Sequence, residues 1–154
     1  MDSVPAATLV RQPTPADEEA FVAAVRGSRD LHEPWIEPPD TAVRYAQYLD
    51  RISKPEYAGF LVIDMADGGL MRDGLAQVIG IAFGVLGLHR LEANIQPSNK
   101  PSISLVTRLG FRHEGFSPQY LMVAGAWRDH ERFALTAEDW ASRPQRTDPS
   151  DWRQ

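Results

Sequence analysis

A short helix with an abrupt end is the feature that most constrains the fold of this chain. The segment NKPSISLVTRLGF, residues 99–111, carries apolar side chains at helical spacing: Ile103, Val106 and Leu109. Gly110 follows directly, and glycine readily takes the left-handed conformation that ends a helix. Phe111 then begins an extended run. The segment therefore predicts an amphipathic helix between two strands, with its N-terminus at Asn99 facing a ligand or partner.

Strand-like and helix-like segments alternate through the rest of the chain. We expect strands at 7–12, 57–65 and 89–95, helices at 16–28, 41–53 and 70–86, and a closing hairpin of 112–124 and 128–136 with its turn at 125–127. Thr14 and Pro15 are start signals for the first helix. Residues 29–40 form a proline-rich loop and 141–154 a polar tail. This order predicts one α/β domain over residues 1–140.

Composition excludes several kinds of site. The 154 residues carry a net charge of −5, so the chain lacks the excess of basic residues that is typical of nucleic-acid-binding domains. There is no cysteine, so disulfides, cysteine metal sites and thiol nucleophiles are excluded. The apolar run 75–88 is too short to span a membrane, and residues 1–21 lack a secretory pattern. We expect a soluble, cytoplasmic protein, a monomer or a homodimer, with neither a nucleic-acid nor a membrane partner.

Four motifs occur in a fixed order in the second half of the chain. They are LMRDGL (70–75), HRLEANIQPSNKPS (89–102), RLGFRHEGF (108–116) and WRDH (127–130). They resemble the GNAT superfamily of acetyl-CoA-dependent N-acetyltransferases, and most closely the subfamily that acetylates the N-terminal amine of ribosomal proteins. The resemblance covers residues 70–140, with weaker support from PWIEPP (34–39).

The resemblance implies both a fold and a reaction. The fold is a GNAT-like, mostly antiparallel central sheet flanked by helices, with a closing β-hairpin at the C-terminus. The reaction is direct transfer of acetyl from acetyl-CoA to an α-amino group, without a covalent enzyme intermediate and without a metal. A small-molecule amine as acceptor, and a binding module without catalysis, remain alternatives.

The segment before the apolar helix corresponds to the family's pyrophosphate-binding loop. Backbone N–H groups and the helix N-terminus make such a loop an anion site. Four residues match the end of the loop and the start of the helix: Gly69, Leu70, Met71 and Arg72. Asp64 and Asp67 stand where the family has a basic residue and a glycine, and an aspartate repels a pyrophosphate.

A second departure from the family lies at about residues 69/70. The strand 57–65 runs almost directly into the apolar helix, whereas the family has two more strands and a loop between them. Two strands, a turn and a loop amount to roughly 30 residues. Either a stretch of the protein is absent from this sequence, which we favour, or the chain is a degenerate relative without the phosphate loop.

The resemblance assigns roles to three residues around the short helix. Ser102, three residues after the asparagine of NKPS, faces the thioester sulfur, and the alternative is a hydroxyl that satisfies the helix backbone. Asn99 lies against the CoA arm, and it also suits a helix N-cap. Glu92 is the general base, and the alternative is a solvated or paired strand carboxylate. Val106 stands where many relatives have a tyrosine that acts as the acid for the departing thiolate, and valine cannot donate a proton.

Two aromatic residues complete the predicted site. Tyr120 on the hairpin approaches the acceptor amine, and Trp35 in the proline-rich loop walls the acceptor pocket; packing is the alternative for both. His89, His113 and His130 have no metal-ligand spacing, so we expect them to be structural.

Overall fold

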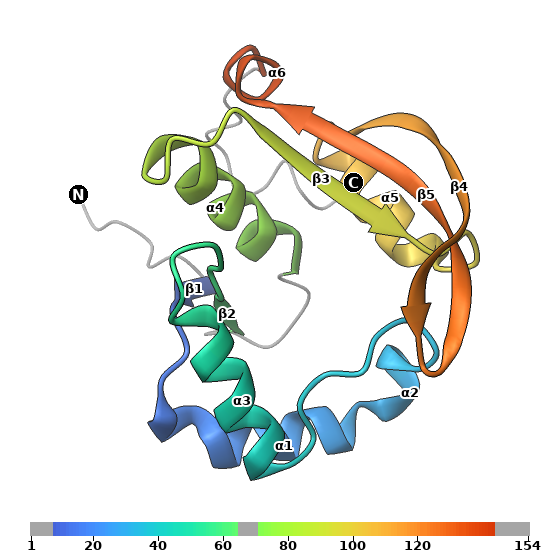
Figure 1. The fold of residues 1–154 in the computed structure, drawn as a ribbon. Helices are drawn as coiled ribbons and strands as arrows, with labels where there is room; N and C mark the ends of the chain where they lie inside the picture. The colour runs from blue at the N-terminus through green and yellow to red at the C-terminus, as the bar shows by residue number, and fades with distance from the viewer. Residues whose placement is uncertain (1–7, 65–70, 144–154) are drawn as a thin grey trace.

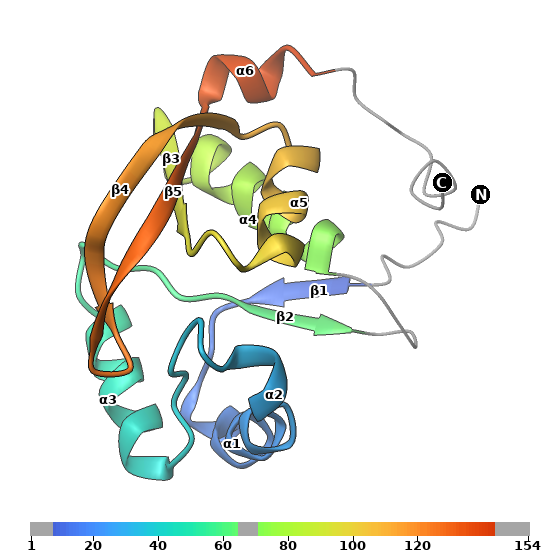
Figure 2. The same ribbon diagram turned by 90° about the vertical axis from the view of Figure 1, so that its right-hand side faces the viewer.

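The computed structural model describes residues 8–64 and 71–143, and Figures 1 and 2 show their arrangement. The first part contains β1 (Thr8–Arg11), the 3₁₀ helix η1 (Pro15–Asp17), α1 (Glu18–Gly27), α2 (Arg29–His32), α3 (Ala42–Ile52) and β2 (Leu61–Asp64). The second part contains α4 (Met71–Gly84), β3 (Arg90–Ile95), α5 (Lys100–Arg108), β4 (Arg112–Val123), β5 (Ala126–Thr136) and α6 (Ala137–Ala141).

The strands form two antiparallel sheets. β1 pairs with β2 from Thr8↔Asp64 to Arg11↔Leu61, and β5 lies between β3 and β4. Within the described residues, β2 pairs only with β1 and β3 only with β5, and no strand stands between β2 and β3. Each of these strands therefore has an edge without a partner strand in the described part of the chain. The predicted antiparallel α/β architecture with a closing hairpin is confirmed.

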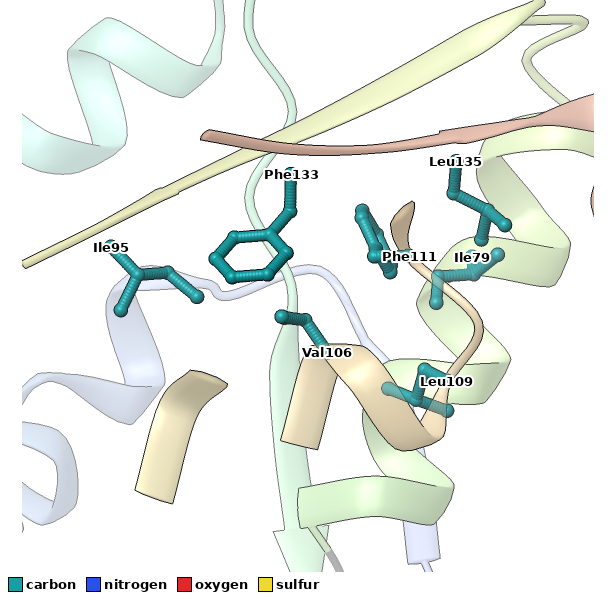
Figure 3. Packing of buried hydrophobic residues seen from close by; sticks show 7 residues of the cluster. All are labelled: Ile79, Ile95, Val106, Leu109, Phe111, Phe133 and Leu135. Atoms are coloured by element: carbon teal, nitrogen blue, oxygen red, sulfur yellow. The ribbon is translucent and has the colours of Figure 1, made fainter. Parts of the chain in front are cut away.

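One apolar cluster holds the second part together, and Figure 3 shows its side chains pointing toward one another. Its buried members are Ile79, Ile95, Val106, Leu109, Phe111, Phe133 and Leu135. They come from α4, β3, α5, the turn after α5, and β5. Figure 2 shows α4 and α5 on the same side of the three-stranded sheet, so this side is the core face. Leu91, Ala93 and Ile95 alternate along β3 toward that face.

The ends of α5 match the prediction from its sequence. The Asn99 side chain accepts a hydrogen bond from the Ser102 backbone N–H at 3.3 Å, which makes Asn99 the N-cap. Gly110 has φ +88°, and its N–H donates to the Thr107 carbonyl at 3.0 Å. The Phe111 N–H donates to the Val106 carbonyl at 3.0 Å. These two bonds form a Schellman motif, so the predicted stop at Gly110 is confirmed.

Three predicted segments differ from the structure, and one helix was not predicted. Residues Arg29–His32 of the proline-rich loop form the short helix α2, and β2 begins only at Leu61. The hairpin turn is Ala124–Gly125, because both residues have positive φ (51° and 75°) as a two-residue turn requires. The predicted turn at 125–127 was therefore wrong, since Trp127 lies in β5. Helix α6 was not predicted, and its N-cap Thr136 accepts from the Asp139 N–H at 3.2 Å.

No helix in the described part of the chain is both long and apolar enough to cross a membrane. The discontinuity expected at about residues 69/70, and with it Gly69 and Leu70, lies outside the described residues.

Candidate functional site

The turn between β3 and α5 anchors the proline-rich loop. Gln96, the residue after β3, is buried, and its side-chain amide donates to the carbonyls of Pro34 and Trp35 at 3.4 Å each. The Asn99 N–H donates to the Gln96 carbonyl at 2.9 Å. Trp35, which is half-buried, is therefore held near the N-terminus of α5 although some 60 residues separate them in sequence.

Ser102 lies in the first turn of α5 and is half-buried. Its backbone N–H is satisfied by the Asn99 side chain. Its hydroxyl makes no hydrogen bond to any residue in the described part of the chain, so the alternative role of satisfying the helix backbone is not observed. The hydroxyl is therefore available to donate to a ligand at the positive end of the helix.

Glu92 lies on the other face of the sheet. It alternates with Leu91 and Ala93, which point into the core beneath α4 and α5. Its carboxylate accepts from Arg90 Nε at 2.9 Å. The structure thus places Glu92 in an ion pair on the face opposite α5, and it does not bring Glu92 together with Ser102.

An ion network surrounds Glu92 on this face. Arg90 also pairs with Glu114, and Arg112 donates to Glu114 at 3.0 Å and to Asp139 at 3.4 Å. Hydrogen bonds from Arg90 and Arg112 lower the pKa of the Glu114 carboxyl to about 2. At this end of the face, each arginine of the network is matched by a carboxylate.

Tyr120 stands in an irregular part of the hairpin. β4 carries extra residues between Ser117 and Leu121, and the Gln119 N–H in that bulge donates to Asp129 at 2.8 Å. Tyr120 is 40% exposed, and its ring meets the His130 ring edge-on at 6.0 Å. No hydrogen bond or ring contact among the described residues joins Tyr120 to Ser102 or Glu92.

Arg143 satisfies the C-terminal end of α5. Burial lowers the pKa of Arg143, and the positive charge of Arg72 lowers it further. Arg143 donates to the carbonyls of Arg108 (2.8 Å) and Leu109, at the C-terminal end of α5. Met71 beside Arg72 is 61% exposed.

The proline-rich loop also borders a cavity of about 430 Å³. Pro34 and Ile36 of the loop line it, together with His32 of α2, Arg44 of α3 and Ala124 of the hairpin turn. Sequence reasoning missed this cavity and the role of Gln96. The only sequence signal for Gln96 was its place in QPSN, directly after a strand.

The central part of the chain matches a known family model. The chain carries a match to the family described as the acetyltransferase (GNAT) domain over residues 58–112. It is also 41% identical over 85 residues to the [ribosomal protein uS5]-alanine N-acetyltransferase of Escherichia coli. That match covers 54% of this chain and 44% of the relative, so the chain spans less than half the length of this curated relative.

Solved structures show the same fold. Mycobacterium smegmatis RimJ in complex with CoA-disulfide superposes with a TM-score of 0.70 at 24% identity, covering 86% of this chain and 83% of RimJ. Spermidine N-acetyltransferase from Vibrio cholerae, in complex with CoA and spermine, has a TM-score of 0.67 at 14% identity, covering 88% of this chain and 99% of that one. Both comparisons confirm the GNAT-like fold predicted from the sequence motifs.

Proposed function

We propose that this GNAT chain transfers an acetyl group from acetyl-CoA to the α-amino group of a ribosomal-protein-like N-terminus in the cytoplasm. The observation that carries the proposal is the N-terminus of α5, where a Ser102 hydroxyl without an internal hydrogen bond lies close to the anchored Trp35 loop. The similarity to a uS5-alanine acetyltransferase supports a peptide acceptor.

The reaction needs a hydrogen-bond donor beside the departing thiolate and a proton acceptor beside the amine nitrogen. The amine nitrogen attacks the thioester carbonyl, a C–N bond forms, the C–S bond breaks, and the nitrogen loses a proton. An α-amino group has a pKa of about 8, so a weak base or water suffices to take that proton. In this proposal Ser102 donates a hydrogen bond to the departing thiolate, and Glu92 accepts the amine proton through water.

The remaining predicted residues divide between the two substrates. Asn99 contacts the CoA arm, while Met71 and Arg72, with Gly69 and Leu70, contact its phosphates. Trp35 and Tyr120 border the acceptor amine.

The decisive experiment measures thiol release from acetyl-CoA with a peptide that begins with alanine, and with spermidine as a second acceptor. Ser102→Ala should lower kcat about 10-fold or more with little change in the KM for acetyl-CoA, because the lost hydrogen bond forms as the thiolate departs. Ser104→Ala, an exposed serine on the same helix, is the matched control. An unchanged kcat for Ser102→Ala removes Ser102 from the mechanism, and faster turnover of spermidine than of peptide identifies a small-amine acetyltransferase.

The pH–rate profile tests Glu92. Glu92→Gln should flatten the acid limb of the profile if its carboxylate accepts the proton. Glu114→Gln disturbs the same ion network from the neighbouring strand and should leave the limb in place. A Glu92→Gln profile that coincides with the wild-type profile assigns the proton transfer to water alone.

A further inference from the structure

The face of the three-stranded sheet opposite α4 and α5 is divided by charge. β5 is regular from Ala126 to Thr136, so Arg128, His130 and Arg132 point to the same face as Glu92 and Arg90 of β3. Near Thr136 the arginines of this face are paired with carboxylates, as described above. Toward the hairpin turn the face carries the two arginines of β5.

These two arginines have no hydrogen-bond or ion-pair partner among residues 8–64 and 71–143. Arg128 and Arg132 are half-buried, and the Nε of each is shielded from solvent without a hydrogen bond. Among the residues that the structure describes, neither side chain makes an ion pair. A shielded guanidinium donor without an acceptor costs free energy, and a carboxylate ligand removes this cost.

The acidic residues of β5 are directed elsewhere. Asp129 and Glu131 alternate to the other face of the strand. Asp129 accepts from the Gln119 N–H, and Glu131 lies 2.6 Å from the His113 ring nitrogen. Neither acid neutralises Arg128 or Arg132, so the described residues leave the positive charge at this end of the face uncompensated.

There is room for a ligand beside Arg132. Its neighbour on β4 is Gly115, and a Cβ placed there meets no atom within 4 Å. Its neighbour on β3 is Asn94, which is exposed and whose side chain has no hydrogen bond to the described residues. Asn94 lies two residues before Gln96, which anchors the Trp35 loop. The arginine surface, defined by Arg128 and Arg132, therefore adjoins the acceptor side of the site.

We propose that the arginine surface binds acidic side chains of the acceptor peptide, so that the preferred substrate is an acidic N-terminal segment. This inference rests on the proposed peptide acetylation. Four residues along a strand span about 13 Å, so the two guanidinium groups match carboxylates spaced along an extended peptide rather than one small anion. Acetyl-CoA is assigned to the N-termini of α4 and α5, and α5 packs on the opposite face of the sheet.

The test compares two fluorescent peptides that begin with alanine and carry either two glutamates four residues apart or glutamines at the same positions. Anisotropy gives their Kd in the presence of CoA, and the transfer assay gives their KM. The wild-type protein should bind the glutamate peptide about 10-fold more tightly, and added salt should reduce the preference. The double variant Arg128→Gln/Arg132→Gln should lose it. Arg112→Gln, an arginine of the same face that is already ion-paired, should keep it.

Equal wild-type affinity for both peptides, or an unchanged preference in a double variant with the wild-type circular dichroism spectrum, overturns the proposal. A double variant that loses affinity for CoA instead of the peptide also overturns it, because the arginines then serve the cofactor phosphates. A different outcome would refute the proposed function alone. If no peptide is acetylated while the binding preference persists, the acetyl-transfer assignment is wrong, but the assignment of the arginine surface to acidic peptides is retained.

Discussion

In the C-terminal half, seven buried apolar side chains from α4, β3, α5, β5 and the turn after α5 form one cluster. In the described residues of the N-terminal half, the buried hydrophobic side chains are Val22, Val25 and Tyr45. That half relies on directed polar contacts. Arg11 donates to Asp17 at 2.8 Å, and the Tyr45 hydroxyl donates to the Thr14 carbonyl at 2.9 Å.

This difference indicates where the stability lies. Burial of apolar surface contributes about 25 cal/mol per Å², whereas an exposed ion pair contributes about 0–1 kcal/mol. We therefore expect the N-terminal half to open locally before the C-terminal half does. α4 links the two halves, because Gly74 lies directly against the Val62 side chain of β2 and leaves no room for a larger residue.

The largest effect is expected from Leu135→Ala, which creates a cavity in the C-terminal cluster. Leu135 is fully buried, so the substitution should lower the free energy of unfolding by about 2–5 kcal/mol, measured by urea denaturation. Val25→Ala in the N-terminal half is the matched comparison and should cost about 1.5 kcal/mol, because fewer carbon atoms are removed than from leucine. Equal losses would show that the two halves share one core.

A smaller effect is expected from Tyr45→Phe. The ring keeps its contact with Phe21, at 5.0 Å between centroids, but the hydrogen bond to Thr14 is lost. The free energy of unfolding should fall by about 1 kcal/mol. Hydrogen exchange should show faster opening of α1 and α3, with β5 unchanged. Faster exchange in β5 as well would contradict independent opening of the N-terminal half.

The smallest effect concerns pH. The pKa of Glu114 is lowered from 4.5 to about 2, so its ion pairs stabilise the folded state above pH 4.5 and are lost as the pH falls toward 2. Glu114→Gln should reduce the loss of stability in this range, as measured by thermal melts at several pH values. Because Arg11 also lowers the pKa of Asp17, part of the acid sensitivity should remain. A wild-type pH dependence in Glu114→Gln would assign all of it to other carboxylates.

Local signals in the sequence predicted the elements well. The Schellman end at Gly110, the Asn99 cap and the antiparallel hairpin depend on residues within a few positions of one another. The hairpin turn begins one residue earlier and ends two residues earlier than predicted, because Ala124 adopts a positive φ that its residue type does not signal. The short helices α2 and α6 were missed because so few residues carry no periodicity.

The candidate site was predicted only in part, for a physical reason. Residue types and motif spacing placed Ser102 and Asn99 at a helix start. The side of the sheet that Glu92 faces depends on pairing with β5, and the position of Trp35 depends on a hydrogen bond from distant Gln96. Neither the strand pairing nor the contact of Gln96 with the loop is encoded in nearby residues.

By itself, the sequence determined the resemblance of residues 58–112 to the acetyltransferase (GNAT) domain, the apolar face of α5 and the points where that helix begins and ends, because caps, periodicity and motifs act over short distances. Tertiary structure alone decided that the described strands divide into two sheets, that Glu92 is held by Arg90, and that Arg128 and Arg132 pair with no carboxylate of the described residues. Those outcomes follow from strand register, since a shift of one residue moves every side chain of a strand to the other face.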